Sequence, residues 1–333
     1  MQSHTAMLLR RLLAPCLCTF ALASVQTAVA QPDAQHYPSK PIRVIVPTSP
    51  GSTADYLARL VGAELSQGMG QPVVVENMAG AGGIPGTRQL VSAAPDGYTL
   101  GIISSNYAVN PSLYRKMPYD SVKDITPISI LGTTPLILSV PADSPYKTLQ
   151  DLVAAAKAKP GSINYASSGK GTALHLAAEL FRSRAGIDVV HIPYKGTNAM
   201  MTDIMAGQVQ FGILASASAL PQIRAGKMRA LAVTTPRRID SLPDVPTMAE
   251  AGVKDYAYDA WLALIAPAGL PKAVSAQLRA QAARALSAPK VREALASQGL
   301  VAVASSEEEA DRTIRGEIVR SAALIRAAGV VAE

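Results

Sequence analysis

The chain has 333 residues, of which 49% are hydrophobic and 17% are charged. This length exceeds the usual limit of one hydrophobic core, so two domains are expected, and the low charge excludes a disordered protein. The net charge of +7 is spread thinly, and the densest basic cluster outside residues 1–30 is Arg237-Arg238. Because no basic stripe is interleaved with aromatic residues, nucleic acid is not expected as a partner.

Residues 1–30 have the layout of a secretory signal peptide. Arg10 and Arg11 precede an uncharged apolar run over residues 12–25, and residues 28–30 (AVA) supply small side chains before a cleavage site. The apolar run is too short to span a membrane. We therefore expect export to the periplasm with cleavage before Gln31.

Two other interpretations of this segment remain open, an uncleaved amphipathic helix and a lipoprotein. Lipidation would use Cys16 or Cys18, but Pro15 precedes the first, and both cysteines lie inside the apolar run. Cleavage removes both cysteines, so the mature chain has no disulfide and no cysteine-ligated metal. No H-x-x-x-H pair exists in the sequence, and no metal is expected.

Apolar β-rich segments alternate with helical patterns in the first half of the chain. Strands are predicted at residues 41–48, 73–75 and 99–105, a helix over 53–67, and a glycine-rich turn at 80–83. A strand–helix–strand rhythm predicts a parallel sheet with right-handed crossovers.

The same rhythm resumes after Pro145. Thr148 and Asp151 have the spacing of a capping box, and so do Ser306 and Glu309. Strands are predicted at 163–167, 189–193, 209–214 and 228–233, and helices at 172–184, 271–286, 291–298 and 306–328.

Two extended apolar stretches, 128–140 and 261–266, are interpreted as crossings between two α/β lobes. The first lobe would comprise residues 31–136 plus 261–333, and the second 137–260. Such lobes enclose a cleft into which strand carboxyl ends and helix N-termini point.

Two loops have the right placement to bind an anion in this cleft. Residues 49–55 follow the first strand, and residues 167–172 precede the helix predicted at 172–184. A helix N-terminus has free N–H groups and about half a positive charge, so it attracts carboxylates. The small residues of both loops allow a ligand to approach these donors.

No segment of the sequence matches the enzyme and cofactor-binding motifs that were compared with it. Residues 164–171 lack the first glycine and the final Ser/Thr of a P-loop, and residues 80–85 lack the third glycine of a dinucleotide fingerprint. No G-x-S-x-G sequence precedes a helix, and no base–nucleophile arrangement is visible. We therefore expect no catalysis and no cofactor.

Seven segments in register identify a family. They are residues 37–43 (YPSKPIR), 70–77 (GQPVVVEN), 94–100 (APDGYTL), 110–114 (NPSLY), 164–169 (NYASSG), 193–196 (PYKG) and 242–247 (LPDVPT). From about residue 37 to the C-terminus the chain resembles the Bug family, the TctC-like substrate-binding proteins of tripartite tricarboxylate transporters.

This resemblance implies a periplasmic binding protein, type II-like, with two Rossmann-like α/β domains joined by a two-crossing hinge. Such proteins capture small carboxylates, including di- and tricarboxylates, acidic amino acids and aromatic acids. It implies that backbone groups and ordered waters hold one ligand carboxylate between residues 49–55 and 167–175. It also implies membrane subunits of a transporter as partners of a monomer. A ligand sensor for a membrane histidine kinase and a secreted carboxylate-processing enzyme are the alternatives.

The chain departs from the family pattern in its loops. Thr48 and Ser52 stand where an aromatic residue and a second glycine are usual, while Asp55 is retained. We interpret Asp55 as a capping residue and a favourable first-turn charge. Lys170 replaces a polar, uncharged residue, so it is either an ion-pair partner of the ligand or a solvated lysine.

A second departure from the family pattern affects the binding of ligands that carry an amine. Leu214 and Ala215 replace a polar pair at the end of a strand, so a ligand ammonium group would lose its acceptor there. Amino acids are therefore predicted to bind less well than carboxylates without an amine, unless Ser216 and Ser218 compensate.

The candidate ligand-binding residues follow from the loops, the strand ends and the second crossing. We interpret His175 as a helix residue that faces the cleft or the core. The single tryptophan, Trp261, is interpreted either as a core-packing residue or as a wall of the cleft. The full set is Ser49, Gly51, Ser52, Thr53, Asp55, Ser104, Ser105, Asn106, Ser168, Gly169, Lys170, Gly171, Thr172, His175, Tyr194, Leu214, Ala215 and Trp261.

Overall fold

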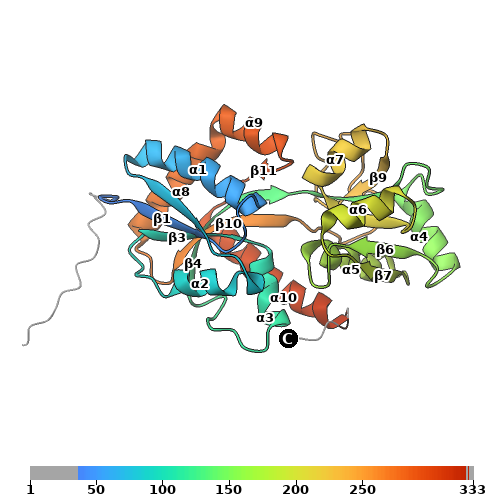
Figure 1. The fold of residues 1–333 in the computed structure, drawn as a ribbon, viewed down its shortest axis with the longest axis horizontal. Coiled ribbons are helices and arrows are strands. Elements are labelled where there is room, and N and C mark those ends of the chain that lie inside the picture. The colour runs from blue at the N-terminus through green and yellow to red at the C-terminus, as the bar shows by residue number, and fades with distance from the viewer. Residues whose placement is uncertain (1–36, 328, 330–333) are drawn as a thin grey trace, which may run out of the picture. The chain divides into compact units, whose positions relative to one another are not determined.

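The computed structural model describes residues 37–327 and 329, all within one compact unit, Pro32–Glu333. The predicted signal peptide at residues 1–30 lies outside these residues. The described chain is a mixed α/β protein with two sheets, each of which forms the centre of a lobe (Figure 1).

The first lobe contains a six-stranded sheet of order β11-β4-β10-β3-β1-β2. Its strands are β1 (Ile42–Val46), β2 (Val73–Asn77), β3 (Thr99–Ser104), β4 (Ile125–Thr134), β10 (Ala260–Pro267) and β11 (Val301–Ala302). The sequence predicted a parallel sheet, but only β1, β2 and β3 are parallel, whereas β10 runs antiparallel to β3 and β4. The reason is that β10 returns from the other lobe instead of following a crossover helix on this sheet.

Helices cover both faces of the first sheet (Figure 1). Alternate residues of β10 show the two faces, because Leu262 and Leu264 pack in one core cluster and Ala263 and Ile265 in another. The helices of this lobe are α1 (Thr53–Met69), α2 (Ile84–Val91), α3 (Asn106–Leu113), α8 (Lys272–Ser287), α9 (Pro289–Ser297) and α10 (Glu307–Ala327). A 3-10 turn, Ala81–Gly83, precedes α2.

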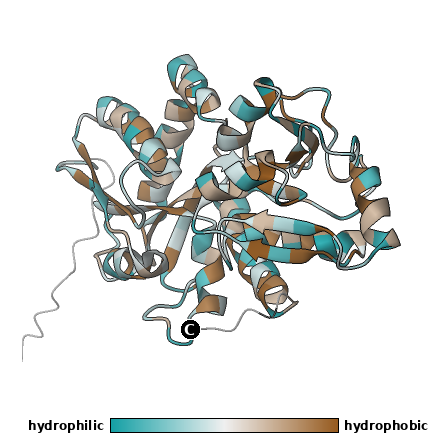
Figure 2. Ribbon diagram, turned by 45° about the vertical axis from the view of Figure 1, so that its right-hand side comes forward, coloured by the Kyte–Doolittle hydropathy of each residue, from teal (hydrophilic) through white to brown (hydrophobic). Residues whose placement is uncertain are grey.

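The second lobe contains a five-stranded sheet of order β7-β6-β8-β5-β9. Phe211 packs on Phe181 of the helix on one face, while the neighbouring Gly212 lies against Met200 and Ile204 of the helix on the other. Its elements are β5 (Leu136–Pro141), α4 (Leu149–Ala158), β6 (Asn164–Ser167), α5 (Ala173–Ala185), β7 (Val190–Pro193), α6 (Thr197–Met205), β8 (Phe211–Ala215), α7 (Ser216–Arg224) and β9 (Met228–Val233). In Figure 2 hydrophobic residues run along the strands of both sheets.

The chain passes between the sheets at two neighbouring places. The stretch predicted at 128–140 comprises β4 of the first sheet and β5 of the second, separated by Pro135. The stretch predicted at 261–266 lies inside β10, so the second crossing is the segment before it, between β9 and β10. Ala260 pairs with Thr134, which places both crossings side by side.

The C-terminal helix α10 packs in both lobes. Ile314 lies in a core cluster of the first lobe, whereas Leu324 and Ile325 lie in the core of the second. Both predicted capping boxes are confirmed, at Thr148 with Asp151 and at Ser306 with Glu309.

Candidate functional site

A cavity of about 250 Å³ lies between the two lobes. Residues of both sheets and of several helix starts line it, and none of these lining residues has a charged side chain. The lining comprises Thr48, Ser52, Thr53, Ala54, Ser104, Ser105, Asn106, Thr134, Leu136, Ala173, Leu174, Ala215, Ala260, Trp261 and Leu262. We call it the interlobe cavity.

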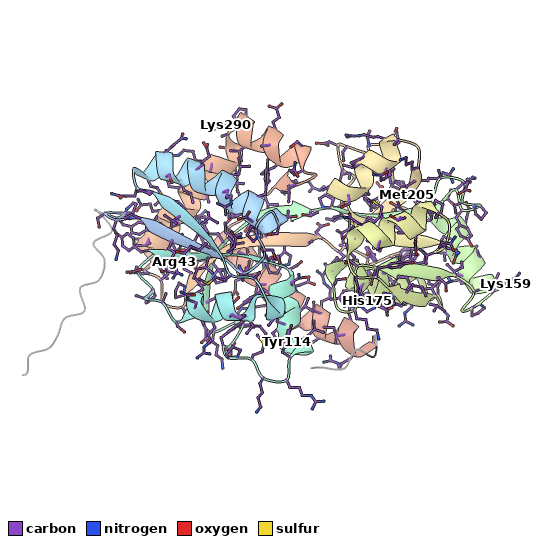
Figure 3. All side chains as sticks on the ribbon, in the orientation of Figure 1. Arg43, Tyr114, Lys159, His175, Met205 and Lys290 are labelled. Carbon is purple, nitrogen blue, oxygen red and sulfur yellow. The ribbon has the colours of Figure 1, made fainter. Side chains whose placement is uncertain are left out.

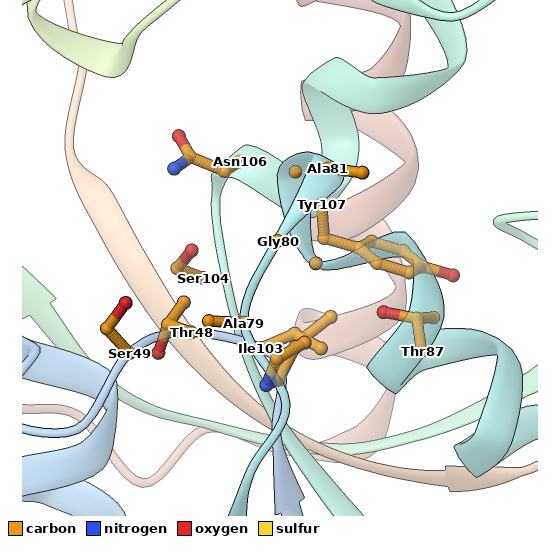
Figure 4. A pocket seen from close by; sticks show the side chains of 13 residues that line it. Thr48, Ser49, Ala79, Gly80, Ala81, Thr87, Ile103, Ser104, Asn106 and Tyr107 are labelled. Carbon is orange, nitrogen blue, oxygen red and sulfur yellow. The ribbon is translucent and has the colours of Figure 1, made fainter.

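A second cavity of about 250 Å³ adjoins the interlobe cavity inside the first lobe. The two share Thr48, Ser104 and Asn106. Figure 4 shows this second cavity, with the hydroxyl-bearing Ser49, Thr87 and Tyr107 and the turn that contains Gly80. Its lining also lacks charged side chains, so the combined space offers hydroxyl groups, one amide and backbone groups to a ligand.

Helix N-termini converge on this uncharged space. The interlobe cavity is lined by the first residues of α1 and α3, by Ala173 and Leu174 at the start of α5, and by Ala215, the N-cap of α7. The N-terminal turn of α2 lines the second cavity. Each N-terminus carries about half a positive charge, so the site attracts an anion although no lining side chain is a cation.

The first predicted loop is held by a carboxylate. Ser52 caps α1 by accepting the N–H of Asp55, and Gly51 donates its N–H to Asp55 Oδ2 over 2.8 Å. Asp55 is 5% exposed and forms an ion pair of 2.9 Å with Arg59. Burial alone would raise the pKa of Asp55, but Arg59 and the Gly51 N–H hold it below its ordinary value, so the acceptor stays ionised.

The second predicted loop has the same plan with a different acceptor. Thr172 caps α5 by accepting the N–H of His175, and Gly171 donates its N–H to His175 Nδ1 over 3.1 Å. Thr172 Oγ1 also donates to the carbonyl of Gly169 over 2.8 Å. His175 (Figure 3) is 2% exposed and belongs to the packed interior of the second lobe.

The structure brings eight of the predicted residues to these two cavities. The interlobe cavity is lined by Ser52, Thr53, Ser104, Ser105, Asn106, Ala215 and Trp261, and the second cavity by Ser49, Ser104 and Asn106. Gly51 and Asp55 instead line a third cavity of about 530 Å³, together with Arg59, Ala217 and Gln298. Trp261 combines both predicted roles, since it is a core residue and a wall of the interlobe cavity.

The remaining predicted residues line none of these three cavities. Leu214 is fully buried in the core of the second lobe, Tyr194 donates its hydroxyl to Asp203, and Lys170 is exposed at the surface of its loop. Ser216 donates its hydroxyl to the carbonyl of Gly299, so that hydroxyl proton is used within the protein. The others are Ser168, Gly169, Gly171, Thr172 and His175, which shape the second loop.

The lining residues that sequence reasoning missed include two groups from particular parts of the fold. Thr134 of β4 pairs with Ala260 of β10, beside Leu262, and Leu136 of β5 pairs with Ala215 of β8. The glycine-rich turn at 80–83 was identified as a turn without a role, although it follows a strand and precedes a helix as the two loops do. That placement in the sequence could have identified the turn as part of the cavity lining.

Within residues 37–327 no group of three or more His, Cys, Asp or Glu residues could hold a metal ion. No helix in the described part of the chain is both long and apolar enough to cross a membrane.

Two α/β lobes with an uncharged cavity surrounded by helix N-termini define a solute-binding protein. A sequence profile described as "Tripartite tricarboxylate transporter family receptor" matches residues 57–330. The chain therefore belongs to this family of transporter receptors. It is also 37% identical to Protein BugT of Bordetella pertussis over 321 residues, which are 96% of this chain and 98% of BugT.

Solved structures share the fold along nearly their whole length. The periplasmic binding protein BugD is 31% identical with a TM-score of 0.70, covering 89% of this chain and 100% of its own. Rpa4515 of R. palustris, solved with adipate, is 32% identical with a TM-score of 0.73 over 89% of this chain and 100% of its own. MatC of Rhodopseudomonas palustris, solved with malate, is 30% identical with a TM-score of 0.69 over 87% and 100%.

Proposed function

We propose that this protein captures a small carboxylate in the interlobe cavity and delivers it to the membrane subunits of a tripartite tricarboxylate transporter. The observation that carries this proposal is the convergence of helix N-termini on a cavity whose lining has no charged side chain. The adipate and malate bound by two relatives support a carboxylate with few carbon atoms.

The ligand carboxylate would accept hydrogen bonds from the starts of α1 and α5. Ser52 and Thr172 each cap the third N–H of their helix, which leaves the first two N–H groups of α1 (Thr53, Ala54) and of α5 (Ala173, Leu174) for the ligand. Lobes bounded at residues 31–136 plus 261–333 and 137–260 would then close around it. The second cavity has room for the distal end of the ligand.

The proposal places the mature protein, residues 31–333, in the periplasm as a monomer. It includes no catalytic step, because the lining of both cavities offers no carboxylate, imidazole or ammonium group as acid or base. Leu214 and Ala215 offer no side-chain acceptor to a ligand ammonium group, so the protein would bind carboxylates without an amine better than amino acids.

Thermal unfolding of residues 31–333 tests the ligand class. After unfolding and refolding to remove co-purified ligand, the protein is mixed with adipate, malate, citrate, benzoate, aspartate and glutamate. A ligand at about 100 times its Kd stabilises by about 2.7 kcal/mol. We expect stabilisation by a carboxylate without an amine and none by adipamide, which has the adipate chain without its charges. Equal stabilisation by adipamide would contradict the anion site.

A matched pair of variants tests the place of binding. Thr53 is the exposed first residue of α1 and lines the interlobe cavity. Thr53→Glu places a carboxylate at a helix N-terminus, where it stabilises the fold by about 0.3–1 kcal/mol, but it repels an anionic ligand. Thr53→Gln has the same size without the charge. We expect weaker ligand binding in Thr53→Glu by about tenfold relative to Thr53→Gln; equal affinities would place the ligand elsewhere.

A further inference from the structure

We propose that His175, supported by His191, is a positioning residue whose neutral imidazole holds the 167–172 loop in its ligand-binding shape. The inference rests on the proposed function, in which this loop presents the start of α5 to the ligand. The loop itself contributes no side chain to the interlobe cavity, so these histidines act through the backbone.

The contacts of His175 determine that one of its ring nitrogens, Nδ1, carries no proton. Nδ1 lies 3.1 Å from the backbone nitrogen of Gly171, which is a donor, so Nδ1 is the unprotonated acceptor. Gly171 is buried, and a buried N–H without an acceptor destabilises the conformation that contains it. The imidazole of His175 therefore satisfies the last loop amide before the cap of α5.

His191 holds the beginning of the same loop. Its Nε2 lies 2.6 Å from the hydroxyl oxygen of Ser167, and that oxygen also accepts the N–H of Gly169 over 3.2 Å. The rings of His191 and His175 are stacked with centroids 4.1 Å apart. The two histidines thus contact both ends of one loop and each other.

The pair rests on a column of aromatic rings in the second lobe. Tyr165 stacks on His191 with centroids 4.8 Å apart and on Phe211 with centroids 5.6 Å apart. Tyr165 of β6 is the register partner of His191 in β7, and its hydroxyl donates to Glu179. The column joins the two histidines to strands β6 and β8 of the sheet.

Among residues 37–327, three charged groups face the two imidazoles. Glu179 of α5 favours protonation, whereas Lys170 of the loop and Arg182 of α5 oppose it. Burial is the largest influence and lowers the pKa of His175, and burial together with His175 lowers the pKa of His191 to about 4. Protonation of Nδ1 would turn the acceptor into a donor facing the Gly171 N–H, so the loop would lose this shape in acid.

Hydrogen exchange of the ligand-free protein separates an acceptor role from a packing role. His175→Phe retains a stacked ring and removes the acceptor, whereas His175→Asn removes the ring and retains an acceptor near Nδ1. We expect amides of residues 169–171 to exchange about tenfold faster in His175→Phe than in the wild type, and His175→Asn to stay within about threefold. Leu176→Ala, a fully buried neighbour on α5, is the control for general destabilisation.

Unchanged exchange in His175→Phe, or the same loop effect in Leu176→Ala, would overturn the inference. If a variant fails to fold, the wild type alone remains informative. Its protection factors at residues 169–171, relative to residues 51–53, should fall between pH 7 and pH 4.5, and a constant ratio would equally overturn the proposal.

Binding of adipate and malate distinguishes this inference from the proposed function. A loop that populates its binding shape less often binds with proportionally lower affinity. We expect His175→Phe to bind about tenfold more weakly than the wild type and His175→Asn to restore binding at pH 7. No binding by the wild type alongside the expected exchange pattern would contradict the proposed function and leave the loop assignment supported. Wild-type binding with equal affinity in His175→Phe would overturn this inference alone.

Discussion

The two loops that precede α1 and α5 share one backbone plan and differ in the group that completes it. In each, a Ser or Thr caps the helix, and the third helical residue reaches back to the N–H of the glycine before the cap. In the first lobe that residue is Asp55, and in the second it is His175. The first acceptor is an ion paired with Arg59, whereas the second is a neutral ring inside an aromatic column.

This difference assigns the two helix starts unequal electrostatic roles. Asp55 places a negative charge in the first turn of α1 and offsets part of its dipole, while α5 has no acidic residue in its first turn. The start of α5 therefore keeps the larger positive potential for an anion. The cost is a dependence on pH, because an imidazole accepts only while it is neutral.

The largest expected effect is a charge placed at the stronger helix start. Ala173→Glu puts a carboxylate at the half-buried first residue of α5, on the wall of the interlobe cavity. Like charges about 5 Å apart repel by about 3 kcal/mol at an effective dielectric of about 20, so adipate affinity should fall on the order of 100-fold relative to Ala173→Gln. Calorimetric titration measures both. A smaller loss than in Thr53→Glu would reverse the ranking of the two helices.

The next effect concerns the stability of the first loop. Asp55→Ala removes the acceptor of the Gly51 N–H, the ion pair with the exposed Arg59, which keeps Asn77 Oδ1, and the first-turn charge of α1. We expect a loss of about 1–2 kcal/mol in the free energy of unfolding. Asp55→Asn keeps an acceptor and should lose less. Urea unfolding at pH 7 gives both values, and equal losses would show that the acceptor geometry contributes nothing.

Mild acid should affect the two loops differently. The pKa of His191 is lowered from 6.5 to about 4 in the folded protein. As the pH drops from about 6.5 to 4, the unfolded chain binds a proton at this residue before the folded chain does, so the free energy of unfolding falls. The pKa of Asp55 is lowered below 3.8, so its contribution persists until the pH falls below that value. Thermal unfolding from pH 7 to pH 4.5 should show a smaller decrease in His191→Asn. Identical pH profiles for the variant and the wild type would contradict this account.

The smallest expected effect is that of Lys170→Ala. Lys170 is exposed and lines none of the three cavities, so adipate affinity should change by less than about threefold. The same variant removes a charge that lowers the pKa of His175 and His191, so the acid transition should move to higher pH. A large loss of affinity that disappears in high salt would instead support an ion pair with the ligand.

Local signals predicted most elements, because capping and strand patterns depend on neighbours in the chain. The caps at Thr148 and Ser306 are examples, and so are the strands of both lobes apart from β11. Helices α3, α6 and α7 were not predicted; in α3 and α7, Pro111 and Pro221 lie inside the helix and lack the N–H that a helix pattern requires. Tertiary packing outweighs that signal, as Tyr107 and Val109 of α3 and Leu220 of α7 are buried.

The lining of the two candidate cavities was predicted in part for the same reason. Ser52, Thr53, Ser104 and Asn106 follow strands or begin helices, which a sequence reveals. Thr134 and Ala260 could not be placed, because they meet only through the antiparallel pairing of β4 with a strand more than a hundred residues away.

The sequence by itself determined the family, the two small-residue loops and the helix starts that follow them, because these depend on residues close together in the chain. Only the tertiary structure decided which helix N-termini surround one cavity, that Leu214 faces the core, and that His175 stacks on His191. Burial and strand register produce those relations, and both join segments that the sequence leaves apart.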